Sequence, residues 1–97
     1  MRNVQFADPE EYSYVGPFIA KLRGDLGVTQ AQVSDATGFS IQSISRFENG
    51  KSSPATIMGE CVIEYVVSSL DIDLTELMDM FDEFIASSKN SGPIVDS

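Results

Sequence analysis

Residues 29–49 carry the start and stop signals of two short helices joined by a tight turn. Thr29 with Gln32 three residues later forms a capping box, which satisfies free backbone N–H groups at a helix start. Gly38 ends the helix that this box opens, because glycine adopts the left-handed conformation of a helix end without steric cost. Ser40 then caps a second helix. So short a connection keeps the two helices in contact, and any fold of the chain has to accommodate this pair.

The rest of the chain also predicts helices, because apolar residues recur at spacings of three and four and no long stretch alternates. Asp8-Pro9-Glu10-Glu11 is expected to open a short first helix, which Gly16-Pro17 interrupts before a second helix runs to Leu26. The next two expected helices cover residues 30–37 and the segment from Ser40 to Asn49-Gly50. The last two cover residues 54–69, opened by Ser53-Pro54, and residues 74–88, opened by Asp73 with Glu76. We expect an all-α domain over residues 15–88, with 1–14 as an N-terminal extension and 89–97 as a flexible tail.

Composition excludes most enzyme chemistry for these 97 residues. The sequence has no histidine, which excludes Ser/His and Cys/His nucleophile pairs and histidine metal sites. The acidic residues lack the glycine and the spacing of a calcium loop. We therefore expect no enzyme, no cofactor and no metal. The absence of a long apolar run or a signal peptide predicts a cytoplasmic protein without a membrane segment.

Charge is distributed unevenly along a chain whose formal net charge is -9. Residues 15–51 are close to neutral, whereas residues 52–97 hold most of the carboxylates with Lys89 as their single cation. Nucleic acid repels negative charge, so the acidic half is expected to lie away from any nucleic-acid interface.

The helix after Ser40 has two distinct faces at 100° per residue. Ile44, Phe47 and Glu48 fall together on one side, and Gln42 and Arg46 point to the other. Glutamine matches the donor and acceptor of adenine, and arginine matches the two acceptors of guanine, so the outer face has the chemistry of base readout. Ile41 and Ser45 flank it, within reach of a thymine methyl or a neighbouring base. The alternative is an ordinary solvated helix face.

Two short helices across a tight glycine turn are the helix-turn-helix arrangement, whose second helix enters the major groove of DNA. The sequence resembles the Xre/Cro type of phage-repressor-like helix-turn-helix proteins from "VGPFIAKLR" through "GVTQAQVSDATGFSIQSISRFENGK" to "SLDIDLTELMDMF". The residues that carry this resemblance are Gly16, Arg23, Thr29-Gln30, Gly38, Ser40, Ile44-Ser45-Arg46 and Glu48-Asn49-Gly50-Lys51. It implies a compact five-helix domain, here with a short N-terminal extension and an extended, acidic C-terminal helix.

The resemblance also implies roles for single residues on double-stranded DNA. Arg23 would pair with Glu48 and tie the first long helix to the helix after Ser40. The positions expected to read bases are Ile41, Gln42, Ser45 and Arg46. The positions expected to contact phosphates are Thr29, Gln30, Ser43, Asn49 and Lys51, with the helix N-terminus assisting Gln30.

The last two helices are more apolar than one small core needs. One stripe of the final helix holds Leu74, Leu77, Met78, Phe81, Phe84 and Ile85, with the acidic residues on its other side. A homodimer that forms through the helices 54–69 and 74–88 would bury this additional apolar surface. Symmetric dimers also suit the recognition of DNA half-sites. The alternative is that the two helices cover each other and the core.

The leading functional hypothesis is therefore a sequence-specific transcriptional regulator, a repressor, that binds a palindromic operator as a homodimer. The alternative is a protein-interaction module with the same fold, such as an antitoxin, an antirepressor or an acidic adaptor. In that case the acidic C-terminal half would bind a basic partner. Adaptation to a saline cytoplasm is a third explanation of the acidity.

Overall fold

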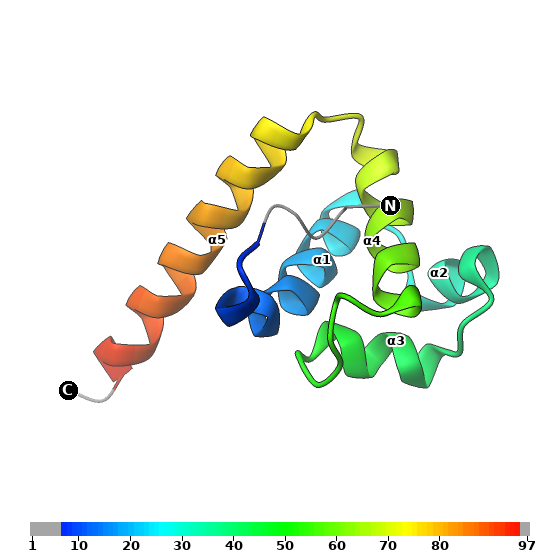
Figure 1. The fold of residues 1–97 in the computed structure, drawn as a ribbon, viewed down its shortest axis with the longest axis horizontal. Helices are drawn as coiled ribbons and strands as arrows, with labels where there is room; N and C mark the ends of the chain where they lie inside the picture. The colour runs from blue at the N-terminus through cyan, green and yellow to red at the C-terminus, as the bar shows by residue number, and fades with distance from the viewer. Residues whose placement is uncertain (1–6, 96–97) are drawn as a thin grey trace.

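The computed structural model describes the backbone of residues 7–95 and the side chains of residues 7–88. Its elements are a 3-10 turn η2 (Pro9–Glu11) and five α-helices, namely α1 (Tyr12–Leu26), α2 (Gln30–Thr37), α3 (Ile41–Glu48), α4 (Ile57–Leu70) and α5 (Leu74–Val95) (Figure 1). All regular structure in these residues is helical, so the predicted all-α fold is confirmed.

The prediction that Gly16-Pro17 interrupts the first helix is wrong, because α1 runs through both residues from Tyr12 to Leu26. Gly16 is buried and packs against the end of α3, so tertiary contact keeps this turn helical. Pro17 lacks an N–H and leaves the Ser13 carbonyl without its helical donor. That carbonyl faces the backbone of the loop after α3 instead.

Both predicted caps of α2 and α3 are confirmed. The Thr29 hydroxyl accepts from the Gln32 N–H at 3.1 Å and the Gln32 side chain accepts from the Thr29 N–H at 2.8 Å, which completes the capping box. Ser40 accepts from the Ser43 N–H at 3.1 Å. Gly38 ends α2 in the left-handed conformation, with φ 84°.

The helix predicted over 54–69 begins three residues later than expected. Thr56 caps α4 by accepting from the Gly59 N–H at 3.0 Å, whereas Ser53 accepts only from the Ala55 N–H. Pro54 is buried, and its backbone lies close to Gly59. A Cβ added to Gly59 would lie 2.7 Å from the Pro54 carbonyl oxygen. The chain therefore turns at Pro54 before the helix starts.

The last helix is longer than predicted, since α5 continues past Ser88 to Val95. Residues 89–95, which were expected to belong to a flexible tail, continue the backbone of α5, and residues 96–97 lie outside the described part. Asp71 links α4 to α5 in the left-handed conformation, with φ 56°.

One hydrophobic core joins the helices. It contains Val15, Phe18, Ile19, Leu22, Val33, Ile44, Phe47, Val62, Ile63, Val66, Leu77, Phe81 and Ile85. Helix α4 packs against α1, α2 and α3, whereas α5 packs against α1. Figure 1 shows α5 on one side of α1, with α2 and α3 at the other end of the molecule.

The apolar stripe of α5 is only partly covered within one chain. Leu77, Phe81 and Ile85 are buried, and the Phe18 ring lies 5.1 Å from the Phe81 ring and 5.5 Å from the half-buried Phe84 ring. The other two predicted members of the stripe remain exposed, Leu74 at 47% and Met78 at 42%. The contact with α1 therefore accounts for the middle of the stripe and leaves its N-terminal end open to solvent.

Candidate nucleic-acid interface

Helix α3 is held by its inner face. Ile44 and Phe47 are fully buried, and α3 packs against α1, α2 and α4. Gly16 allows the closest of these contacts, because a Cβ at this residue would lie 1.7 Å from the Phe47 carbonyl oxygen. The predicted division of α3 into an inner and an outer face therefore holds, and the inner side chains leave little freedom to the helix.

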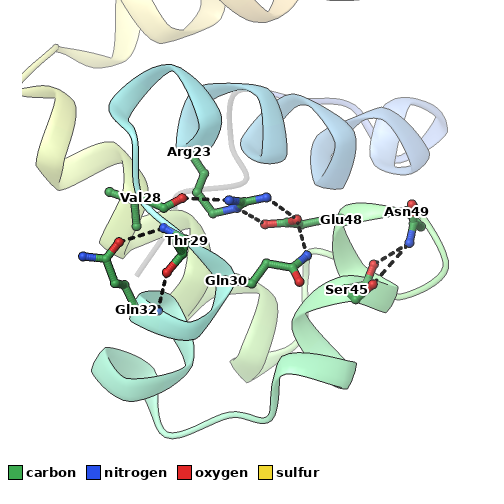
Figure 2. Close-up of polar contacts among 8 residues, drawn as sticks. All are labelled: Arg23, Val28, Thr29, Gln30, Gln32, Ser45, Glu48 and Asn49. Atoms are coloured by element: carbon green, nitrogen blue, oxygen red, sulfur yellow. Dashed lines mark hydrogen bonds and ion pairs between the residues drawn. The ribbon is translucent and has the colours of Figure 1, made fainter.

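The side chains predicted to read bases lie mostly on the outer face. Gln42 and Arg46 are exposed, and Ile41 is exposed although it is apolar. Ser45 is half-buried, and its hydroxyl accepts a hydrogen bond from the Asn49 amide at 3.4 Å. Three of the four side chains are thus exposed. The fourth, Ser45, lies in the C-terminal turn of α3, where it contacts Asn49 (Figure 2).

The residues predicted to contact phosphates differ in how free their side chains are. Lys51 and Thr29 are exposed, although the Thr29 hydroxyl is used in the capping box. The Ser43 hydroxyl accepts from Ser40 at 3.0 Å, and the Asn49 amide donates to the Ser45 carbonyl at 2.9 Å. The side chains of Thr29, Ser43 and Asn49 thus stabilise the ends of α2 and α3. Any contact that they make with DNA would come in addition to this role.

An ion pair between Arg23 and Glu48 joins α1 to α3. Arg23 Nε lies 2.7 Å from Glu48 Oε2, and Arg23 Nη2 lies 3.0 Å from Oε1, so the guanidinium binds both carboxylate oxygens. Arg23 Nη1 also donates to the Val28 carbonyl at 2.7 Å, which fixes the connection to α2 (Figure 2). Glu48 is 7% exposed and is the buried charged residue of the described part of the chain. Its charge is compensated, as burial requires.

Gln30 belongs to the same network, which sequence reasoning missed. Its Nε2 donates to Glu48 Oε1 at 2.8 Å, so α1, α2 and α3 meet at one carboxylate (Figure 2). The sequence showed Gln30 at the start of a helix and Glu48 on an inner face. Only the packing of α2 against α3 brings the two together, and the one available signal was that a buried carboxylate needs several donors.

Comparison with known proteins agrees with this geometry. Residues 19–58, which include α2, the turn, α3 and the start of α4, match a family model described as helix-turn-helix. Over these residues the chain is similar to helix-turn-helix domains of the Xre/Cro type. This family consists of DNA-binding regulatory domains and is not a family of enzymes. Neither a curated protein nor a solved structure matches the chain.

Within residues 7–88, positive charge that is free for a ligand lies only at the end of the helix-turn-helix motif. Of the cations whose side chains are described, Lys21 binds Asp25 at 2.9 Å and Arg23 binds Glu48. Arg46 and Lys51 are the two that have no carboxylate partner within residues 7–88, and both are exposed. The only free cations of the described domain thus lie on α3 and directly after it.

The exposed carboxylates of α5 lie on the other side of α1 from the motif. Glu76, Asp79, Asp82 and Glu83 are all exposed, and α5 packs on α1, which separates it from α2 and α3 (Figure 1). Over residues 7–95, no helix is both long and apolar enough to cross a membrane.

Proposed function

We propose that the protein is a sequence-specific transcriptional regulator, a repressor, that inserts α3 into the major groove of DNA. The observation that carries this proposal is the outer face of α3, where Gln42 and Arg46 are exposed opposite the buried Ile44 and Phe47. Gln42 would pair with the two edge groups of an adenine, and Arg46 with the two acceptors of a guanine. Ile41 would contact a thymine methyl.

Phosphate contacts would position this helix without adding sequence information. Lys51 supplies the free charge, and Thr29, Ser43 and Asn49 lie on the turns at either end of α2 and α3. Because each phosphate that a cation neutralises contributes about -0.9 to the salt slope, a dimer in which Lys51 of each subunit neutralises one phosphate gives a slope of about -2. We therefore expect modest affinity, obtained from base contacts more than from charge.

The regulator would act as a homodimer on a palindromic operator, with α4 and α5 forming the interface. Apart from Ile41, the exposed large apolar side chains of the described residues are Ile57 on α4 and Leu74 and Met78 on α5. A second copy would remove these side chains from water, at about 25 cal/mol per Å². The carboxylates near Leu74 and Met78 repel each other across such an interface, so salt would strengthen the dimer while it weakens DNA binding.

The test is selection of duplexes from a random pool, followed by fluorescence anisotropy over a range of salt concentrations. We expect one enriched palindromic site and a loss of about 1–3 kcal/mol for Arg46→Ala or Gln42→Ala. Lys21→Ala removes one positive charge from α1 and serves as the control, because Lys21 already binds Asp25 of the same helix. If selection enriches no sequence and the α3 variants behave like the control, the proposal fails.

The second candidate function is a protein-interaction module that uses the acidic helix α5. The exposed carboxylates of α5 favour it, because they would steer a basic partner. The same selection separates the two functions, since an interaction module would enrich no duplex. Replacing Asp79 and Asp82 with Asn would weaken the binding of such a basic partner without changing the anisotropy of a selected duplex.

A further inference from the structure

Asn49-Gly50, at the end of α3, is a dipeptide in which an asparagine loses its side-chain amide easily. The backbone nitrogen of the glycine gives up its proton and attacks the asparagine Cγ, which closes a five-membered ring and releases the amide as ammonia. Water then opens the ring at one of its two carbonyls, to aspartate or isoaspartate. Glycine favours ring closure because it has no Cβ beside the attacking nitrogen. Asn49 is exposed, so water reaches the site.

Two hydrogen bonds oppose this reaction in the folded domain. The Gly50 N–H donates to the Phe47 carbonyl at 3.0 Å, which stabilises the protonated form of the attacking nitrogen. The Asn49 Nδ2 donates to the Ser45 carbonyl at 2.9 Å, so the side chain is directed back along α3 (Figure 2). Ring closure destroys both bonds, since the Gly50 nitrogen loses its proton and the Asn49 amide nitrogen leaves.

Packing against α1 supports the first of these bonds. A Cβ on Gly16 would lie 1.7 Å from the Phe47 carbonyl oxygen, so the close approach of α1 restricts this carbonyl. Gly50 is restricted as well, because a Cβ on it would lie 2.8 Å from the Ser13 carbonyl oxygen. Ring closure needs a rotation of the peptide group between Asn49 and Gly50, to bring Cγ and nitrogen together. The contacts with α1 oppose this rotation.

A carboxylate at position 49 would lie next to the free cations of the helix-turn-helix motif. The Lys51 N–H donates to the Arg46 carbonyl at 2.9 Å, so the turn that contains Asn49 joins these two residues. The new charge would also lie at the negative end of the α3 dipole. Its oxygens would repel the Ser45 carbonyl, which the Asn49 amide binds before the change.

We propose that Asn49 is a modification site, which loses its amide when the end of α3 separates from α1, and that the aspartate or isoaspartate formed lowers the affinity for DNA. The effect on DNA rests on the function proposed above, whereas the reaction itself does not. Water is the only co-reactant. Because ammonia is lost, the conversion accumulates with the time that the end of α3 spends open.

The first arm of the test measures loss of the amide in the full chain. The protein is incubated at mildly alkaline pH, and peptide mapping by mass spectrometry follows the replacement of NH2 by OH at Asn49. The rate in the folded protein is at least about thirtyfold below the rate in urea, the factor expected for two hydrogen bonds. Equal rates in the folded and the unfolded chain overturn the proposal.

Gly16→Ala and Gly24→Ala test whether the contact with α1 protects Asn49. A Cβ on Gly16 displaces the Phe47 carbonyl, whereas a Cβ on Gly24 has no neighbour within 4 Å. At a temperature at which circular dichroism shows both variants folded, Gly16→Ala loses the amide about fivefold faster than the wild type, the factor for one hydrogen bond. Gly24→Ala is no faster than the wild type. Equal rates for the two variants overturn the proposal.

Hydrogen exchange keeps the test decisive where Gly16→Ala does not fold. Low concentrations of urea, at which the wild-type chain stays folded, raise the exchange rate of the Gly50 N–H. Loss of the Asn49 amide rises in proportion, because both processes require the bond from Gly50 to Phe47 to open. Amide loss that does not follow the exchange of Gly50 contradicts the proposal.

Asn49→Asp tests the effect on DNA, with Asn49→Ser as the matched neutral control. Both variants remove the donor to the Ser45 carbonyl, and only the first adds a charge. Asn49→Asp binds the selected duplex about fivefold more weakly per subunit than Asn49→Ser, the factor for one close pair of charges in water. Equal affinities overturn the effect on DNA. A wild-type protein that binds no selected duplex refutes the proposed function instead, and the rates at Asn49 still decide the modification site.

Discussion

Gly16 and Gly24 lie in the same helix and allow a direct test of how α1 and α3 are packed. A Cβ on Gly16 would lie 1.7 Å from the Phe47 carbonyl oxygen, whereas a Cβ on Gly24 has no neighbour within 4 Å. The normal separation is about 3.2 Å, so Gly16→Ala forces the two backbones about 1.5 Å apart. Because the obstacle is backbone, no side-chain rotation relieves the contact.

The expected cost follows from this displacement. Overpacking of a core costs about 1–3 kcal/mol, and the shift of α3 also strains the buried pair of Arg23 with Glu48. Alanine returns up to about 1 kcal/mol of helix propensity, so the upper end of the overpacking cost leaves a net loss of about 2 kcal/mol for Gly16→Ala. For a domain of this size the melting temperature falls by about 8–16 °C. Gly24→Ala has only the propensity gain, and raises the melting temperature by about 4 °C.

Thermal unfolding followed by circular dichroism measures both variants, with urea unfolding as a check on the free energy. The two substitutions are chemically identical and lie in one helix, so the difference between them isolates the contact with Phe47. Equal stabilisation by the two substitutions would refute the close approach of α1 to α3 and, with it, the way in which α3 is held.

Three further predictions concern charge, capping and the core. Lys51→Met reduces the magnitude of the salt slope of DNA binding by about 1 per subunit, and Lys21→Met leaves it unchanged, as anisotropy at several salt concentrations will show. Thr56→Ala lowers the free energy of unfolding, measured in urea, by about 1 kcal/mol, because Thr56 caps α4. Ser53→Ala lowers it by less, and the opposite order would contradict the start of α4 at Ile57. Phe81→Ala costs about 3–5 kcal/mol in the same assay, and a loss below 1 kcal/mol would mean that α5 does not pack on α1.

The helices around the turn could be predicted from sequence because their signals are local. The capping box of Thr29 with Gln32 and the caps at Gly38 and Ser40 depend on residues within three or four positions, and each is present in the structure. The two faces of α3 follow from helical periodicity, which placed Ile44 and Phe47 in the core. In helices as short as α2 and α3, the capping residues at the two ends determine most of the helix boundaries.

The errors discussed here occur where a packing contact overrides a local capping or breaking signal. Gly16-Pro17 is a strong helix breaker in isolation, but the contact of Gly16 with Phe47 keeps α1 continuous. Ser53 before Pro54 is a plausible cap, yet Pro54 packs against Gly59 and delays α4 until after Thr56. The bond from Gln30 to Glu48 depends on the packing of α2 against α3, for which the sequence offers no pattern.

The attachment of α5 to α1 also bears on how such a chain can change over generations. Helix α3 depends on α1, α2 and α4, whereas α5 depends on α1 through Phe81 and its neighbours. Substitutions of the exposed carboxylates of α5 are therefore expected to have little effect on α3, so the acidity of this helix can change without disturbing α3. Under the proposed function, a chimera that carries only the acidic face of another α5, with Leu74, Met78 and Phe81 retained, should inherit the partner of the donor and the operator of the recipient.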